Sequence, residues 1–258
     1  MRFDAKVCLV AGGARGIGAA TAEALVREGG RVVIGDTRAD EMEELVTQLG
    51  DAATSIHLDV RDEASCAAFV EHAVETFGRV DTLVNSAIRM APGPLLDLHA
   101  DDFRSLLEVG LTGTFLTAQA FARRVIADGR PGAIVNLSSI GGRFPYSGAG
   151  AYSTVKGGTI LLSQQMALEW AEAGIRVNAI APGHIETPLT AYLQDPEVKR
   201  ARSAATPLGR VGRPEDVAEG ILYLLSDAAS YVTASVLDID GGVGASIMNH
   251  LKGRRWDR

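Results

Sequence analysis

The stretch Val7–Gly18, VCLVAGGARGIG, decides the fold of this 258-residue chain. Its first five residues are all apolar, a pattern typical of a strand that is buried on both faces. Glycines at positions 12, 16 and 18 follow, where the strand pattern gives way to helical spacing. Glycine has no Cβ, so the backbone of such a turn can approach a ligand closely, while the first helix amides point at an anion. The stretch therefore predicts a strand, a phosphate-binding turn and a helix.

Short apolar runs alternate with amphipathic helical runs along the rest of the chain. A parallel sheet covered on both faces produces this alternation, and right-handed crossovers favour a doubly wound sheet. An eight-stranded barrel would need an eighth strand, which the pattern does not supply. We therefore expect one α/β domain over 1–258, with seven parallel strands. The expected strands are Val7–Ala11, Arg31–Gly35, Thr54–Leu58, Val80–Val84, Ala133–Leu137, Arg176–Ile180 and Val236–Ile239, and the expected helices are Gly16–Glu28, Ala39–Leu49, Glu63–Phe77, Ala100–Ala127, Ala151–Ala173 and Glu215–Leu225.

Composition excludes several classes of protein. The chain has 32 acidic and 25 basic residues, a net charge of −7, which argues against a nucleic-acid-binding surface. Its two cysteines, Cys8 and Cys66, lack the spacing of a metal site and cannot form a disulfide framework. No apolar run is long enough to span a membrane, and Asp4 and Lys6 interrupt any signal peptide. We expect a cytoplasmic protein without metal, with a solvated basic end over 252–258.

An acidic residue stands at the end of the second predicted strand. Asp36 follows Gly12 by 24 residues, the interval expected between a phosphate-binding turn and a ribose-binding acid. A carboxylate there accepts hydrogen bonds from both ribose hydroxyls and repels a 2′-phosphate. NAD is therefore favoured as cofactor. Arg15 is the counter-evidence, because an arginine beside the turn can pair with a 2′-phosphate, so NADP stays the alternative.

A tyrosine and a lysine open the long helix after the fifth strand. Tyr152 and Lys156 are four residues apart, so their side chains lie on one helix face. A phenol ionises at a pKa of about 10, and a neighbouring ammonium favours the phenolate. Ser139 follows the fifth strand, at the carboxyl edge where open α/β sheets bind ligands. The three residues predict a general acid/base beside a hydroxyl that holds a substrate oxygen.

With these motifs the sequence resembles the short-chain dehydrogenase/reductase family, in its single-domain branch. The resemblance covers Val7 to about Gly242, nearly the whole chain. It implies a Rossmann-like fold, hydride transfer between NAD and a secondary alcohol or ketone, and a homotetramer. An NADP-dependent reductase of the 3-oxoacyl type is the alternative enzyme. Further matching segments are Asp59-Val60, Asn85-Ser86-Ala87, Pro182-Gly183 and Asp240-Gly241-Gly242.

The resemblance also implies roles for individual residues. Tyr152 would be the general acid/base, Ser139 would position the substrate oxygen, and Lys156 would bind the nicotinamide ribose and lower the Tyr152 pKa. The stretch 186–209, polar and irregular, resembles the family's mobile substrate lid. Cofactor contacts are expected from Gly12, Arg15, Gly16, Ile17, Gly18, Asp36, Asp59, Val60, Asn85, Ala87, Tyr152, Lys156, Pro182, Gly183, Ile185 and Thr187. Substrate contacts are expected from Arg89, Arg143 and His184, which could bind a carboxylate or phosphate, with Met90, Phe144, Tyr146, Tyr192 and Leu193 around them.

The sequence departs from the family pattern at Ala11, where the family usually has threonine, and at two positions near this chemistry. Ile88 stands where the family has glycine, and Gly110 stands where it has an asparagine that holds a water in a proton relay to the lysine. Three interpretations follow: a water fills the vacated space, the relay is missing and turnover is slow, or the protein is a nucleotide-binding module without catalysis. The presence of Ser139, Tyr152 and Lys156 favours an enzyme.

Overall fold

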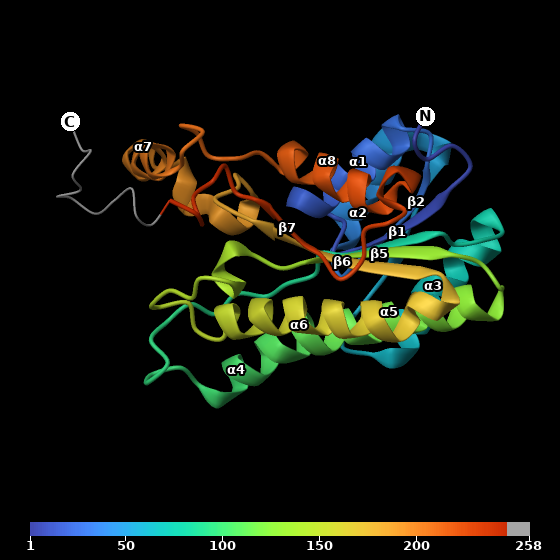
Figure 1. Ribbon diagram of the computed structural model, residues 1–258, viewed down its shortest axis with the longest axis horizontal. Coiled ribbons are helices and arrows are strands. Elements are labelled where there is room, and N and C mark those ends of the chain that lie inside the picture. The colour runs from blue at the N-terminus through green and yellow to red at the C-terminus, as the bar shows by residue number, and fades with distance from the viewer. Residues whose placement is uncertain (247–258) are drawn as a thin grey trace.

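Seven parallel strands form the centre of the structure, a computed structural model that describes residues 1–246, in the order β3-β2-β1-β4-β5-β6-β7 (Figure 1). The basic segment 252–258 lies outside the described residues. The order reverses between β1 and β4, which makes the sheet doubly wound, so the predicted Rossmann-like α/β fold is confirmed. The strands are β1 (Val7–Ala11), β2 (Arg31–Asp36), β3 (Ala53–His57), β4 (Thr82–Asn85), β5 (Gly132–Leu137), β6 (Ile175–Pro182) and β7 (Val236–Ile239).

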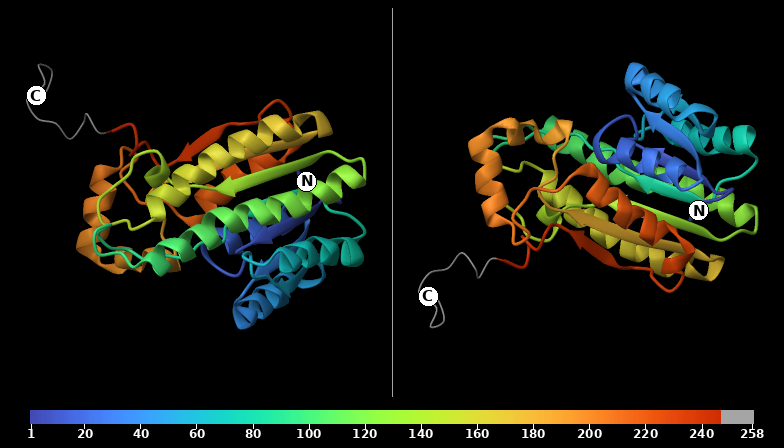
Figure 2. Two further views of the ribbon diagram at one scale, coloured as in Figure 1. Left: turned by 90° about the horizontal axis from the view of Figure 1, so that it is seen from below. Right: turned by 90° about the horizontal axis from the view of Figure 1, so that it is seen from above.

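Helices cover both faces of the sheet (Figures 1 and 2). The core consists of two apolar layers, because successive strand residues point to opposite faces. Val10 and Ile34 belong to the layer under α1, α2 and α8, whereas Leu9 and Leu83 belong to the layer under α3, α5 and α6. The helices are α1 (Gly16–Arg27), α2 (Ala39–Leu49), α3 (Glu63–Phe77), α4 (Ala100–Leu107), α5 (Gly113–Ala127), α6 (Tyr152–Trp170), α7 (Pro196–Ala205) and α8 (Pro214–Leu225).

The long helix expected over 100–127 contains a π turn. Residues Glu108–Thr112 widen the helix between α4 and α5, and Gly110 lies buried in this turn. A π turn inside a helix is rare and occurs mostly at functional sites. Here it faces α6, the helix that carries Tyr152.

The prediction that 186–209 is irregular was wrong. The segment forms a 3₁₀ helix, Pro188–Gln194, followed by α7. Asp195 caps α7, because its carboxylate accepts hydrogen bonds from the amides of Glu197 at 2.8 Å and Val198 at 3.4 Å. Pro188 and Pro196 each begin a helix, where a missing N–H costs nothing. Both prolines therefore start helices.

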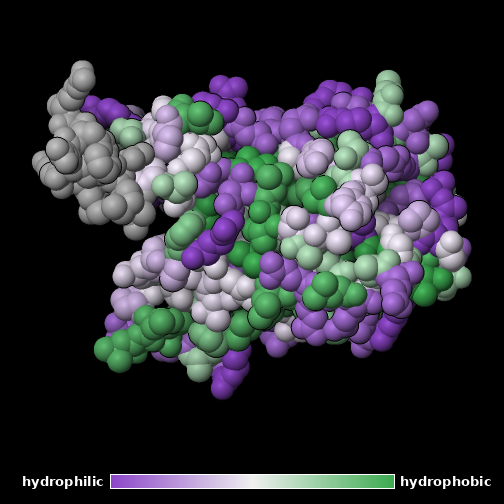
Figure 3. All heavy atoms as spheres, viewed as in Figure 1, coloured by the Kyte–Doolittle hydropathy of each residue, from purple (hydrophilic) through white to green (hydrophobic). Residues whose placement is uncertain are grey.

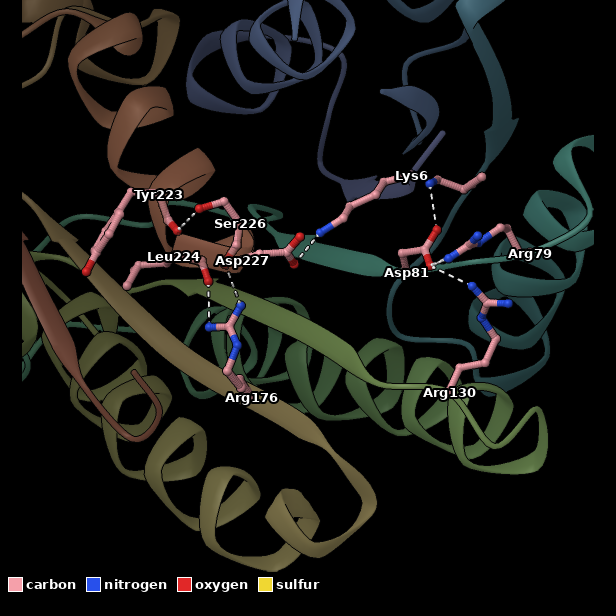
Figure 4. A network of polar contacts seen from close by, with 10 residues as sticks. Lys6, Arg79, Asp81, Arg130, Arg176, Tyr223, Leu224, Ser226 and Asp227 are labelled. Carbon is pink, nitrogen blue, oxygen red and sulfur yellow. Dashed lines mark hydrogen bonds and ion pairs between the residues drawn. The ribbon is translucent and has the colours of Figure 1, made fainter. Parts of the chain in front are cut away.

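Charged side chains tie the elements together at the amino ends of the strands (Figure 4). The buried Asp81 carboxylate accepts a hydrogen bond from the Val7 amide at 2.9 Å and pairs with Arg79 and Arg130. Arg176 donates to the carbonyl of Leu224 at 2.8 Å, near the end of α8. These contacts stabilise the edge of the sheet opposite the predicted site. Within residues 1–246, no helix combines the length and apolar character needed to cross a membrane.

Candidate active site

A cavity of about 630 Å³ opens at the carboxyl edge of the sheet. Figure 3 shows the hollow between the part of the molecule that carries α7 and the part that carries α4, with apolar residues on its walls. Its size suits a large ligand. Gly18 and Asn85 do not line it. The predicted residues that do are Gly12, Arg15, Gly16, Ile17, Asp36, Asp59, Val60, Ala87, Arg89, Met90, Ser139, Tyr152, Lys156, Pro182, Gly183, Ile185 and Thr187.

The glycine turn between β1 and α1 forms one wall of this cavity. Gly12 has a φ of +74°, and a Cβ at this position would stand 2.4 Å from the amide nitrogen of Ala87. A Cβ at Gly18 would stand 2.2 Å from the Gly12 carbonyl oxygen. Both positions therefore require glycine. Gly18 packs against the backbone of the turn and does not line the cavity. The open turn and the start of α1 fit a pyrophosphate group.

Asp36 lies at one end of the cavity, beside two arginines. Its carboxylate accepts hydrogen bonds from the amides of Ala14 at 3.2 Å and Thr37 at 2.8 Å, and it pairs with the Arg38 guanidinium at 3.0 Å. Arg38 and Arg15 both line the cavity. Arg38 was not selected from the sequence, although its position two residues after Asp36 places it near the same end of the strand. This part of the cavity thus combines a buried carboxylate with two cations.

The resemblance implies adenine contacts from Asp59 and Val60, and backbone contacts with the adenosine side of the cofactor from Asn85 and Ala87. Asp59 and Val60 line the cavity, and hydrogen bonds from Arg61 hold the pKa of Asp59 at about 2. Asn85 is instead buried under the cavity, where its side chain donates to Asn136 at 2.9 Å and accepts from Thr117 at 2.6 Å. The Asn85 side chain therefore holds β4, β5 and α5 together.

The catalytic candidates meet at the other end of the cavity. Tyr152 is the first residue of α6, and Ser139 follows β5 and accepts a hydrogen bond from the Gly141 amide at 3.0 Å. Lys156 is 4% exposed, and its Nζ donates to the Leu137 carbonyl at 2.6 Å and lies 5.9 Å from the centroid of the Tyr152 ring. The structure thus brings together the three side chains that the sequence selected.

Burial controls the ionisation of this group. Burial raises the pKa of Tyr152, and a hydrogen bond with Ser139 opposes the rise. Burial lowers the pKa of Lys156 to about 8. The Lys156 ammonium points at the Leu137 carbonyl, and burial is the largest influence on the Tyr152 pKa. That Lys156 lowers the Tyr152 pKa stays a prediction.

Comparison with known proteins agrees with this geometry. A family model described as enoyl-(acyl carrier protein) reductase matches residues 12–244. A cis-4-hydroxycyclohexanecarboxylate dehydrogenase of Sinomonas cyclohexanicum is 42% identical over 246 residues, 94% of this chain and 98% of that protein. The chain belongs to the short-chain dehydrogenase/reductase family.

Other relatives differ in the substrate that their names give. A 3-oxoacyl-[acyl-carrier-protein] reductase of Thermotoga maritima is 39% identical over 246 residues, 94% of this chain and 99% of that protein. A sorbitol dehydrogenase of Cereibacter sphaeroides is 38% identical over 252 residues, 94% of this chain and 98% of that protein. These short-chain dehydrogenase/reductases are oxidoreductases of alcohols and ketones, and the family uses the nicotinamide dinucleotides NAD or NADP.

The two departures from the family pattern at Ile88 and Gly110 lie against each other. A Cβ on Gly110 would stand 2.4 Å from Val155 Cγ1 and 2.9 Å from Ile88 Cδ1. The interpretation that Gly110 leaves a vacated space is therefore wrong, since two apolar side chains fill the direction that an asparagine side chain would take. Ile88 also lines the cavity. Its side chain occupies space beside Gly110, which has no side chain of its own.

The three expected substrate cations lie in different surroundings. Arg89 lines the cavity and bonds to Ser105 at 2.6 Å and Asp102 at 3.2 Å. Arg143 is outside the cavity lining and pairs with Asp238 at 2.7 Å. His184 lines a smaller neighbouring cavity of about 200 Å³. Of the three, only Arg89 lines the main cavity.

Proposed function

We propose that this protein transfers hydride between NAD(H) and a secondary alcohol or ketone, with Tyr152 as general acid/base. The observation that carries the proposal is the continuous cavity, which has Asp36 and the glycine turn at one end and Ser139, Tyr152 and Lys156 at the other. A bound nicotinamide dinucleotide supplies the hydride acceptor or donor. Its adenosine end would meet Asp36, and Lys156 would contact its nicotinamide ribose.

The side chains of the site would handle the substrate oxygen and its proton. Ser139 Oγ would hold this oxygen by a hydrogen bond. During alcohol oxidation the Tyr152 phenolate takes the hydroxyl proton as the C=O bond forms, and during ketone reduction the phenol returns it. Lys156 is cationic below its pKa of about 8 and so provides a positive charge near the phenolate.

The proposed preference for NAD rests on Asp36. Its buried carboxylate would accept hydrogen bonds from a ribose, and it would repel a 2′-phosphate. A specific observation supports the alternative of an NADP-dependent 3-oxoacyl reductase. Arg15 and Arg38 both line this end of the cavity, and the Thermotoga maritima relative carries the corresponding name. Parallel assays with the two nucleotides decide between the two proposals.

The first experiment is to follow the absorbance of reduced nicotinamide with NAD and then NADP over a panel of secondary alcohols. We expect turnover with NAD. Tyr152→Phe should lower kcat by at least about 1,000-fold while the dissociation constant of NADH changes little, since the phenol acts on the proton rather than on binding. Tight nucleotide binding without turnover on any alcohol or ketone would instead support a nucleotide-binding module.

Two further proposals concern assembly and the lid. We propose a homotetramer, which is supported by apolar side chains exposed on α5 and α6: Phe115, Leu161 and Leu168. We also propose that the segment 186–209 is a substrate lid. Leu189 and Thr190 of this segment line the same cavity as Ser139 and Tyr152.

A further inference from the structure

Arg202 is a cation on α7 that the proposed chemistry does not use. Its side chain is exposed, and its Nη1 lies 3.4 Å from Nε2 of His184. Across residues 1–246 no carboxylate lies within ion-pair distance of Arg202, whereas its neighbour Lys199 pairs with Glu186 at 2.7 Å. Arg202 therefore keeps its charge available for a ligand.

The histidine beside Arg202 does not neutralise this charge. Burial lowers the pKa of His184, and the Arg202 charge lowers it further, so the imidazole is neutral at neutral pH. Asp240 also acts on His184, but its two carboxylate oxygens accept the amides of Gly242 at 2.8 Å and Gly244 at 2.7 Å. A neutral imidazole accepts a hydrogen bond from Arg202 and orients the guanidinium.

Tyr146 packs beside the catalytic group. A Cβ on Gly141 would stand 3.0 Å from Tyr146 Cε1 and 3.5 Å from both Ser139 Oγ and Tyr152 Cε1, so the Tyr146 ring packs next to the reacting groups. Burial and the Tyr192 hydroxyl raise the pKa of Tyr146, and the Arg202 charge opposes this rise. Tyr192 also raises the pKa of Tyr152. Arg202 is held close to this site by His184, because His184 stands between Gly183 and Ile185, which both line the main cavity. Arg202 and the two tyrosines lie outside the lining of that cavity.

We propose that Arg202 binds a carboxylate of the substrate, so that the protein acts on alcohols or ketones that carry an acid group remote from the reacting carbon. A guanidinium binds a planar carboxylate through two parallel hydrogen bonds. Tyr146 and Tyr192, each about half exposed, offer ring faces to the apolar part of such a molecule. The inference rests on the proposed function, because it takes Tyr152 as the position of the reacting oxygen.

The test compares matched substrates. Oxidation of cis-4-hydroxycyclohexanecarboxylate, its methyl ester and cyclohexanol should be measured with wild type, Arg202→Gln, Arg202→Lys and Arg200→Gln. Arg200 is the matched control, since it is exposed on α7 two residues away and does not share a face with Arg202. Arg202→Gln should reduce kcat/KM for the acid by roughly 10- to 100-fold and leave the ester within about 3-fold. Arg202→Lys should restore part of the loss, and Arg200→Gln should behave as wild type.

A binding measurement separates this inference from the proposed function. Titration calorimetry with cyclohexanecarboxylate and its neutral amide, in the presence of NADH, needs no turnover. We expect the acid to bind more tightly than the amide, and Arg202→Gln to remove that difference. Equal affinity of acid and amide for wild type would overturn the inference, as would oxidation of ester and acid at equal rates. Acid binding that depends on Arg202, with no turnover of any alcohol, would support the subsite and contradict the proposed function.

Discussion

Ile88 Cδ1 lies 2.9 Å from the point where a Cβ on Gly110 would stand. The resemblance to the family implies a glycine at position 88 and an asparagine at position 110. Here the larger residue stands against the smaller one, so the two departures form one packing arrangement. Val155 closes the same space from α6, with its Cγ1 at 2.4 Å from that point. The arrangement lies in the π turn beside the catalytic helix.

Restoring the family residue alone should therefore harm the protein. We expect Gly110→Asn to lower the free energy of unfolding by about 1–3 kcal/mol through overpacking, and to lower kcat by shifting α6. Chemical denaturation measures the first effect. In the double variant with Ile88→Gly, the total loss should be smaller than the sum of the single losses. Gly129→Asn is the control, since no atom lies within 4 Å of its Cβ position and asparagine tolerates a φ of +63°. A stable, faster Gly110→Asn variant would contradict this packing argument.

The buried Lys156 should make stability depend on pH. Its pKa is about 8 in the folded protein and about 10.5 in an ordinary environment. Between these values the unfolded chain binds more protons, so the free energy of unfolding rises with pH, by roughly 3 kcal/mol over this window. In the unfolded chain the thiols of Cys8 and Cys66 also ionise in this window, whereas burial raises their pKa to about 12 in the folded protein. The difference between wild type and Lys156→Met therefore isolates the lysine.

Denaturation of the nucleotide-free protein from pH 7.5 to about pH 10 measures this difference. We expect wild type to gain stability relative to Lys156→Met as pH rises, because the cost of burying the ammonium disappears. A constant difference across the series would mean that Lys156 keeps its ordinary pKa.

Asp36 should select the nucleotide. We expect Asp36→Ser to reduce kcat/KM with NAD by roughly 10- to 100-fold and to improve use of NADP, because the repelling carboxylate is lost while Arg15 and Arg38 remain. Initial rates with both nucleotides measure the shift. Adding Arg38→Ala should remove the gain with NADP. An Asp36→Ser enzyme with the wild-type preference would show that the acid only holds the turn through Ala14 and Thr37.

Much of the fold and of the catalytic group could be predicted because their signals are local. The helices Ala39–Leu49 and Glu63–Phe77 and the strand Val7–Ala11 have the predicted bounds, since burial on one face or both fixes their periodicity. Arg202 could not be found in this way. Its relation to His184 arises from how α7 folds back across 18 residues, and nothing in its immediate sequence marks it. The side-chain contacts of Asn85 could not be found from its motif either, because the motif implies only a backbone contact and the partners Thr117 and Asn136 come from distant parts of the chain.

The charged cluster at the amino edge should contribute to stability. Asp81→Ala leaves the buried Val7 amide without its acceptor and removes the partner of two arginines that are about one-third exposed, so the free energy of unfolding should fall by about 1–3 kcal/mol. Urea denaturation measures this loss. Asp101→Ala, which removes an exposed pair with Arg104, is the control and should change little. If both variants unfold alike, the cluster contributes no more than a surface pair.

The exposed leucines of α6 should determine the oligomeric state. Leu161 and Leu168 are 68% and 76% exposed, and they lie seven residues apart on one side of the helix. If α5 and α6 form the interface of a homotetramer, a charge at both positions would be buried without a partner on assembly. Light scattering after size exclusion should therefore give four chains for wild type and a smaller species for Leu161→Glu/Leu168→Glu. Leu96→Glu, at a position that is 95% exposed on a loop before α4, should remain tetrameric. A wild-type monomer, or a double variant that still assembles, would exclude this face as the interface.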